Sequence, residues 1–398
     1  MAQMNIAVIF GGPTTEHDVT IVTAHEVIKA LDPTRFTALP VYWAPDGNFY
    51  TGAALMERTS FPFSPDLQRK LTPLTFTAFD RDASGRALVT IGGGGFFKKP
   101  ERYAIDAVIP VAHGTTVEDG NLQGFLTVLG IPFTGPGTFA AALFMNKMAT
   151  KKLLAAHGVP VLPAITVDRP REGFADFSKL AADLKLPSDY PVIVKPNFLG
   201  SSVAVTRADN AAQLAAGIAN VFKFDTTAII EPCVDPLVEY NVSVTRAFGD
   251  IQLSAVEKPE RKGNVLDFAT KYIGDGTKGG AKKLRAGMRF AGRELDPSSL
   301  TAAQRKMIED SARAVMAASG TKGAPRIDFI SNGDTGEIWL NEVNAVPGDF
   351  ASFLWECGPA AKTFTELLTA LVNEAMAARQ QESRLSDPAQ AGAVIFKR

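Results

Sequence analysis

The chain has 398 residues, of which 46% are hydrophobic and 21% are charged, and its formal net charge is −1. This length exceeds what one compact core usually holds, so we expect two or three domains. The near-neutral charge excludes the strongly basic surface on which general binding to nucleic acid or anionic membranes depends.

The predicted elements at the start of the chain alternate between strands and a helix. Residues 5–10 form a buried strand, residues 15–31 have the spacing of an amphipathic helix, and residues 38–43 form a second strand. This order predicts an α/β fold for the first domain. Residues 45–104 look irregular, and we interpret them as an insertion with a hairpin. The glycine run 92–95 is interpreted as a flexible turn, because no helix pattern or Lys–Ser/Thr pair follows it.

The rest of the chain continues as mixed strands and helices. Further strands are predicted at residues 103–111, 192–195, 203–205 and 228–231. Further helices are predicted at residues 122–129, 138–157, 211–221, 301–318 and 358–380. The pattern changes near residue 235, where longer strands begin, so we expect a domain boundary there.

Two further features bear on location. Cys233 and Cys357 have no metal-ligand spacing and form no disulfide framework, which fits a reducing compartment. No apolar run approaches the ~20 residues of a membrane span, and the N-terminus lacks the pattern of a secretion signal. We therefore expect a cytoplasmic protein without membrane or nucleic-acid partners.

The stretch from Arg326 to Asn344 carries the clearest chemistry. Two apolar, β-branched runs around a turn of Gly, Asn and Asp predict a β-hairpin. Side chains alternate along a strand, so Arg326 shares a face with Asp328. By the same rule Glu342 shares a face with Asn344. Two carboxylates, an amide oxygen and a guanidinium on one surface suit Mg²⁺ and phosphate, and the alternative is a hairpin with one solvated polar face.

Two lysines are candidates for binding phosphate. The chain has no Gly-x-x-x-x-Gly-Lys-Ser/Thr loop and no Gly-x-Gly-x-x-Gly after a strand, so a nucleotide site must be built differently. Lys195 ends a predicted strand just before Gly200, where loop amides can cover phosphates. Lys147 lies on a predicted helix and could add a second positive charge. Each lysine alone is also consistent with a solvated surface charge.

Five segments carry a family resemblance. They are the strand and loop that end at Glu16–His17, the loop from His113 to Gly124, the loop from Lys195 to Ser202, the pair Lys271–Tyr272, and the hairpin from Arg326 to Gly348. In this order they resemble the D-alanine–D-alanine ligases of the ATP-grasp superfamily. The resemblance covers residues 5 to about 350 and is faint across 45–100.

The resemblance implies an α/β protein with a three-domain ATP-grasp architecture. An N-terminal Rossmann-like domain, residues 1–134, binds substrate and contains the insertion at about 45–104. A central lid domain, residues 135–234, and a C-terminal catalytic domain, residues 235–398 with the tail, are α+β domains that sandwich ATP. We also expect a homodimer, as is usual in the family.

The resemblance also implies roles for individual residues. Two Mg²⁺ ions, or alternatively Mn²⁺, are held by Asp328, Glu342 and Asn344. ATP is bound by Lys147, Lys195, Glu231, the backbone at Val234, and Glu239. Catalytic roles fall to Glu16, Ser201, Tyr272, Arg326 and the amide of Gly348, and substrate-binding roles to His113, Lys271 and Ser352. Glu16 takes the ammonium of the first D-alanine, Ser201 and Tyr272 bond with Glu16, and Arg326 and Gly348 stabilise charge at the reacting carboxyl.

The implied activity is ATP-dependent ligation of two D-alanines through an acyl phosphate, for peptidoglycan precursors. Such chemistry depends on positioning and charge neutralisation more than on covalent help from the protein. Because acyl phosphates hydrolyse readily, the site must exclude water, and the glycine-rich loop with Tyr272 is a candidate lid.

One segment departs from the family pattern. After Pro347–Gly348 the family usually has a serine that meets the carboxylate of the second substrate, whereas here Ser352 comes one position early and Phe353, Leu354 and Trp355 follow. The acceptor is therefore open. Tyr272 favours an amine over a hydroxy acid. The alternatives are a related carboxylate–amine ligase with another acceptor, or a non-catalytic nucleotide-binding relative.

Overall fold

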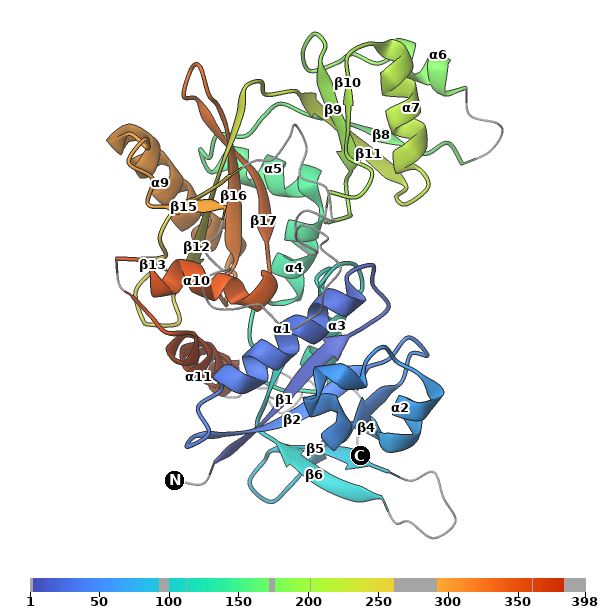
Figure 1. Ribbon diagram of the computed structural model, residues 1–398, viewed down its shortest axis with the longest axis vertical. Helices are drawn as coiled ribbons and strands as arrows, with labels where there is room; N and C mark the ends of the chain where they lie inside the picture. Colours follow the sequence, from blue (N-terminus) through green and yellow to red (C-terminus); the bar gives the residue numbers. More distant parts are fainter. Residues whose placement is uncertain are drawn as a thin grey trace, which may run out of the picture.

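The computed structural model describes residues 3–92, 100–111, 113–171, 176–200, 202–260, 292–359 and 361–382. Within these residues the chain forms sheets of seven, four and six strands (Figure 1). The seven-stranded sheet lies at the bottom of the view, the four-stranded sheet at the upper right and the six-stranded sheet at the upper left.

The seven-stranded sheet has the order β6-β5-β4-β3-β2-β1-β7. Its strands are β1 (Met4–Gly11), β2 (Phe36–Trp43), β3 (Phe49–Thr51), β4 (Thr72–Arg81), β5 (Ala87–Ile91), β6 (Glu101–Ile105) and β7 (Ala107–Val111). β1 pairs in parallel with β2 and β7, and α1 (His17–Ala30) connects β1 to β2. This confirms the predicted β–α–β opening.

β1 is buried on both faces, which explains why its sequence is continuously apolar. Ile6, Val8 and Phe10 belong to a core on one side that includes side chains of α1 and α11 (Phe364–Glu382). Ala7 and Ile9 belong to a second core, together with side chains of α3 (Asn121–Val128). The last helix of the chain therefore packs on the first sheet.

The interpretation of residues 45–104 as an irregular insertion is wrong for most of its length. β3, β4, β5 and β6 extend the sheet from β2 with antiparallel pairing. Between β3 and β4 the chain forms the short helices η1 (Ala53–Met56), η2 (Arg58–Ser60) and α2 (Pro65–Lys70). The expected hairpin is β4–β5. Of the predicted glycine turn, Gly93–Gly95 lie outside the described residues.

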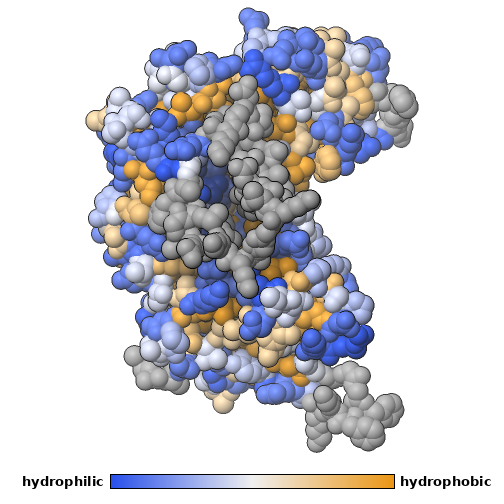
Figure 2. All heavy atoms as spheres, viewed as in Figure 1, coloured by the Kyte–Doolittle hydropathy of each residue, from blue (hydrophilic) through white to orange (hydrophobic). Residues whose placement is uncertain are grey.

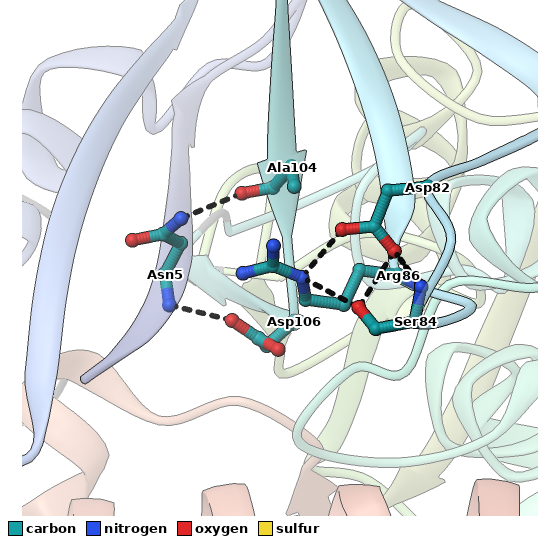
Figure 3. A network of polar contacts seen from close by, with 6 residues as sticks. All are labelled: Asn5, Asp82, Ser84, Arg86, Ala104 and Asp106. Atoms are coloured by element: carbon teal, nitrogen blue, oxygen red, sulfur yellow. Dashed lines mark hydrogen bonds and ion pairs between the residues drawn. The ribbon is translucent and has the colours of Figure 1, made fainter. Parts of the chain in front are cut away.

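The strand predicted at 103–111 is divided at Asp106 into β6 and β7 (Figure 3). The Asp106 carboxylate accepts a hydrogen bond from the Asn5 backbone N–H at 2.7 Å, and the Asn5 side chain donates to the Ala104 carbonyl at 2.8 Å. Asn5 thereby holds both strand ends beside β1. In the same view Asp82 closes the β4–β5 turn through Ser84 and Arg86.

The four-stranded antiparallel sheet has the order β10-β9-β11-β8. It consists of β8 (Ile165–Asp168), β9 (Val192–Pro196), β10 (Thr206–Ala208) and β11 (Thr227–Pro232), with α6 (Phe177–Ala182) and α7 (Ala211–Val221) in its core. The predicted helix 211–221 matches α7. The strand predicted at 203–205 is wrong, because those residues form a turn and β10 begins at Thr206.

The helix predicted at 138–157 is broken at Asn146 into α4 (Thr138–Met145) and α5 (Lys147–Ala156). The Asn146 side chain caps α5 by accepting a hydrogen bond from the Ala149 backbone N–H at 2.9 Å. This cap fixes where α5 starts and so places Lys147 in its first turn.

The six-stranded sheet has the order β15-β14-β12-β16-β17, with β13 paired to β12. Its strands are β12 (Leu237–Thr245), β13 (Gln252–Leu253), β14 (Glu257–Pro259), β15 (Arg293–Leu295), β16 (Arg326–Asn332) and β17 (Ile338–Asn344). Helix α9 (Ala302–Ser319) packs against Ile327 and Phe329 of β16. The opposite face of β16 carries Arg326 and Asp328.

After β17 the chain forms η4 (Gly348–Ala351) and α10 (Ser352–Glu356), and α11 then returns to the first sheet. In the described part of the chain, no helix is both long and apolar enough to cross a membrane.

Candidate active site

The hairpin β16–β17 brings its polar side chains onto one face. Asp328 lies directly opposite Glu342, and Arg326 lies opposite Asn344. The Arg326 guanidinium binds Asp328 through both carboxylate oxygens, at 2.7 and 2.8 Å. The Asn344 side-chain amide donates to Asp328 at 2.9 Å. The predicted hairpin and the predicted grouping of these four side chains are both present.

The donor set on this face fits a hard divalent cation. Asp328 and Glu342 supply carboxylate oxygens from adjacent strands, and Asn344 supplies an amide oxygen. Arg326 already compensates the charge of Asp328 through the paired contact, so a cation bound there would release the guanidinium toward other anions.

A second cluster lies inside the four-stranded sheet and beside α5. Glu231 of β11 pairs with Lys195 of β9 at 2.7 Å and with Lys151 of α5 at 2.8 Å. Lys195 also donates to the side-chain oxygen of Asn341 on β17 at 3.0 Å. The cluster thus joins the four-stranded sheet to the hairpin, next to Glu342.

Burial and charge oppose each other at Glu231. Burial alone would raise the pKa of its carboxyl, but Lys195 and Lys151 outweigh burial and hold the pKa at about 2. Burial lowers the pKa of Lys151, against the attraction of Glu231. Glu231 is therefore an ionised carboxylate between two buried lysines.

Lys147 lies at the boundary of the same region. Its ammonium donates to the Leu199 carbonyl, and its backbone N–H donates to the Asn197 carbonyl at 3.0 Å. Burial lowers its pKa, while the charge of Glu342 acts in the opposite direction. The start of α5 is thereby tied to the loop after β9, which leads to Gly200.

The remaining predicted nucleotide contacts lie between β11 and β12. Val234 is half-buried in the connection, and Glu239 is half-buried on β12. Glu239 is two residues from Asn241, which pairs with Asp328 across the sheet, so Glu239 and Asn241 project from the face that carries Asp328. Glu239 therefore shares a sheet face with the polar side chains of the hairpin.

A third group of side chains comes from the seven-stranded sheet. Glu16 precedes α1, and His113 and Glu118 belong to the loop after β7; their ligand atoms all lie within 4.8 Å of one another. The Thr14 hydroxyl donates to the His113 carbonyl at 2.6 Å and joins the two loops. Burial lowers the pKa of His113 to about 4 and raises that of Glu118 to about 8.

Glu118 connects this group to the hairpin. One carboxyl oxygen accepts from the Gly114 backbone N–H at 2.7 Å, and the other accepts from the Val346 backbone N–H at 3.2 Å. Val346 lies two residues before Gly348, so Glu118 helps to position the segment that carries the predicted oxyanion-stabilising amide. Glu118 lies in the loop from His113 to Gly124, but the sequence does not single it out as a site residue.

The segment after Gly348 has an unusual backbone. Asp349, Phe350 and Ala351 have φ angles of 41°, 55° and 49°, which are uncommon for residues other than glycine. Such conformations cluster at functional sites. A Cβ built on Gly348 would have no atom within 4 Å, so the space beside its Cα is open. The Ser352 side chain, in contrast, is fully buried.

All three sheets therefore contribute to one region. The outline of the molecule is indented between the four-stranded sheet and the seven-stranded sheet (Figure 2). Among the predicted site residues, Ser201, Lys271 and Tyr272 lie outside the described residues. Lys151 was not predicted, and its only signal was its place one turn from Lys147 on the same helix.

Comparison with known proteins is consistent along the chain. The family model described as D-ala D-ala ligase N-terminus matches residues 5–136, and the model described as D-ala D-ala ligase C-terminus matches residues 153–373. A D-alanine–D-alanine ligase of Nocardia farcinica is 32% identical over 94% of this chain and 98% of its own length. One of Macrococcus caseolyticus is 31% identical over 94% and 95%.

Solved structures give the same fold. A D-alanine–D-alanine ligase of Coxiella burnetii aligns with a TM-score of 0.76 and 22% identity, covering 99% of both chains. A D-Ala:D-Ser ligase of Enterococcus faecalis aligns with a TM-score of 0.71 and 26% identity, covering 94% of this chain and 100% of the other. The chain has the ATP-grasp fold that was expected from its sequence.

Proposed function

The chain belongs to the D-alanine–D-alanine ligase family, and from this premise we propose that it joins two D-alanines in an ATP-dependent, ADP-forming reaction. The product, D-alanyl-D-alanine, is a peptidoglycan precursor. The observation that carries the proposal is the face of β16–β17, where two carboxylates, an amide and an arginine lie beside a buried lysine cluster.

The proposed reaction has two steps. The carboxylate of the first D-alanine attacks the γ-phosphorus of ATP, ADP leaves, and an acyl phosphate forms. The amine of the second D-alanine then attacks the acyl carbon, loses a proton and expels inorganic phosphate as the amide bond forms. Positioning and charge neutralisation supply most of the rate in such transfers.

The residues divide between nucleotide and metal binding. Lys147 and Lys195 contact the phosphates of ATP, and Asp328, Glu342 and Asn344 would hold two Mg²⁺ ions, or Mn²⁺, whose charge offsets that of the phosphates. Base and ribose contacts are assigned to Glu231, the backbone at Val234, and Glu239. The buried ion pairs of Glu231 support a fixed position for Lys195.

The amino acid substrates are assigned to the other side of the region. Glu16 binds the ammonium of the first D-alanine beside His113, while Ser201 and Tyr272 bond with Glu16. Arg326 and the Gly348 amide stabilise the charge that develops at the reacting carboxyl. Lys271 and Ser352 are assigned to the substrate, although the burial of Ser352 leaves the acceptor side to other groups.

The broader organisation is also part of the proposal. We assign the substrate domain to residues 1–134, the lid domain to 135–234 and the catalytic domain to 235–398. A cytoplasmic location follows from the need for ATP. A homodimer is supported by the exposed apolar side chains Phe125 and Val128 of α3 and Phe139 of the neighbouring α4.

A second candidate is a ligase with another acceptor, which the apolar wall of Phe353, Leu354 and Trp355 and the likeness to a D-Ala:D-Ser ligase both favour. ADP release measured with D-alanine alone and with D-serine, D-lactate or L-alanine added separates the two. The proposal predicts full turnover on D-alanine alone. If turnover requires another acceptor, the second candidate function replaces the first.

A non-catalytic relative is tested by one pair of variants. Glu342→Gln removes a predicted metal ligand, and we expect its turnover to fall roughly 100-fold. Glu337→Gln changes an exposed glutamate at the other end of the same hairpin and should leave turnover within about twofold. If wild type shows no turnover, or if both variants match it, the ligase assignment or its metal site is wrong.

A further inference from the structure

The face that carries Glu342 and Asp328, where the metal is proposed to bind, extends across the six-stranded sheet to its edge. Glu257 of β14 is paired with Asn241 of β12, and Asn241 is paired with Asp328 of β16. Directly paired residues project from the same face of a sheet, and the Asn241 amide donates to Glu257 at 3.0 Å. The polar row that begins with Glu342 therefore reaches β14.

Arg293 stands at the end of this row. It lies on β15, two residues before Leu295, which is paired with Glu257, so it projects from the same face. Its guanidinium forms an ion pair with Glu257 at 3.1 Å. The Glu257 side chain is 5% exposed and that of Arg293 is 29% exposed, so the arginine is anchored on one side and reachable on the other.

The same guanidinium lies over the segment that follows Gly348. Its central carbon is 4.3 Å from the centroid of the Phe353 ring, and Leu295 packs against the small core of Ala351, Phe353 and Leu354. A guanidinium stacked on an aromatic ring is held in a defined plane. β15 thus places a fixed cation on an otherwise apolar wall.

The acceptor of the proposed reaction needs a positively charged partner for its carboxylate. The acceptor amino acid reacts through its amine, and its carboxylate must be bound without reacting. A carboxylate held unpaired beside the Phe353 ring would lose solvation without compensation. Ser352 cannot compensate from its buried position, whereas a guanidinium has five donors, of which the ion pair to Glu257 uses few.

We propose that Arg293 binds the carboxylate of the acceptor amino acid and is a specificity-determining residue of this chain. This inference rests on the proposed ligase function. It requires the acceptor to be an amino acid with a free carboxylate and disfavours amides and amines of the same shape.

The test is an internal competition between D-alanine and D-alaninamide. D-Alaninamide has no carboxylate to phosphorylate, so it can act only as acceptor. In a mixture with ATP and Mg²⁺, the ratio of D-alanyl-D-alanine to D-alanyl-D-alaninamide, measured by mass spectrometry, gives the ratio of the two acceptor kcat/KM values. This ratio does not depend on the donor step or on the amount of folded enzyme.

We expect Arg293→Gln to lower that product ratio by about 10- to 100-fold, because hydrogen bonds to charged groups contribute ~1.5–3 kcal/mol. KM for ATP should stay within about twofold. The matched control is Arg305→Gln. Arg305 lies on the neighbouring helix α9, its side chain is similarly exposed at 33%, and it forms an ion pair with Asp296 at 2.9 Å. The control should leave the product ratio unchanged.

Three results would overturn the inference. The first is a wild-type product ratio near one, and the second is a product ratio in Arg293→Gln within twofold of wild type. The third is a fall in the product ratio that occurs only in Lys271→Gln, which would assign the acceptor carboxylate to that lysine. If Arg293→Gln does not fold, Arg293→Lys replaces it; a several-fold lower ratio is expected, and an unchanged one contradicts the inference. If wild type forms neither product, the proposed function itself fails.

Discussion

At the scale of single residues, the buried cluster around Glu231 is the most demanding feature of the site. An ionised carboxylate and two ammonium groups lie almost fully out of water. Desolvation of each charge is costly, and removing one partner from such a group costs more than its net contribution. Lys151 and Lys195 therefore hold Glu231 ionised and in place.

Lys151→Ala should lower the apparent free energy of unfolding in urea by about 3 kcal/mol, the low end of the range for breaking a buried pair, because Lys195 remains. Lys152→Ala, at the adjacent exposed position, should change it by less than about 0.5 kcal/mol. Equal effects of the two substitutions would show that the cluster does not stabilise the fold.

His113 makes stability depend on pH. Its folded pKa, about 4, lies below its ordinary value of 6.5, because burial disfavours the charged ring. Below pH 6.5 the unfolded chain binds a proton at His113 that the folded chain does not bind. The stability that the neutral His113 contributes is therefore complete above pH 6.5 and is lost as the pH falls toward 4.

Between pH 7 and pH 5 this group alone should cost about 2 kcal/mol of unfolding free energy. His113→Gln removes this titrating group. The difference in unfolding free energy between wild type and variant, measured by urea unfolding at pH 7 and pH 5, should therefore be smaller by that amount at pH 5. A difference that is the same at both values would mean that His113 titrates normally in the folded protein.

At the scale of elements, the start of α5 links helix geometry to the proposed nucleotide site. The Asn146 side chain caps α5 and also accepts from the Asn197 amide at 3.1 Å, in the loop after β9. The cap therefore fixes both the first turn of α5, with Lys147, and the loop that its ammonium contacts.

Asn146→Ala should lower the unfolding free energy by about 1 kcal/mol, the usual cost of a lost cap, and should raise KM for ATP several-fold. Asn210→Ala removes the corresponding cap of α7, where Asn210 accepts from Gln213 at 3.0 Å, and should cost the same stability without changing that KM. If KM for ATP rises in neither variant, or rises in both, the result would contradict a role for Lys147 in ATP binding.

The elements show what the sequence could predict. The hairpin and α7 follow from local patterns of alternation, turn residues and helical spacing, and both are as predicted. The division at Asp106 depends on a hydrogen bond from the distant Asn5 backbone, and at Asn146 the local cap is joined by a contact with the distant Asn197 side chain. β3 to β6 were missed because they pair with a sheet edge that the local pattern does not reveal.

The candidate site shows the same limit. Hairpin periodicity was enough to place Asp328 with Glu342, because both lie on adjacent strands. The pairing of Lys151 with Glu231, the bridge from Glu118 to Val346 and the stacking of Arg293 on Phe353 join segments far apart in the chain. No local pattern carries such contacts.

At the scale of the whole molecule, the region is assembled from all three sheets and closed by the return of α11. Leu367 and Leu371 of α11 are fully buried in the core of the seven-stranded sheet, and Glu374 accepts from the Gly323 backbone N–H at 2.8 Å, just before β16. The helix thereby connects the sheet that carries Glu16 to the strand that carries Asp328. The site depends on this arrangement because no single sheet holds all of its groups.

The central claim is that a carboxylate is activated by phosphoryl transfer in this region. The most direct measurement uses D-alanine with ¹⁸O in its carboxylate, followed by mass spectrometry of the phosphate released with each dipeptide. The account predicts one ¹⁸O atom per phosphate, because the oxygen that attacks ATP departs with phosphate when the amide forms. Phosphate free of ¹⁸O, with the label retained in the amino acid, would contradict it.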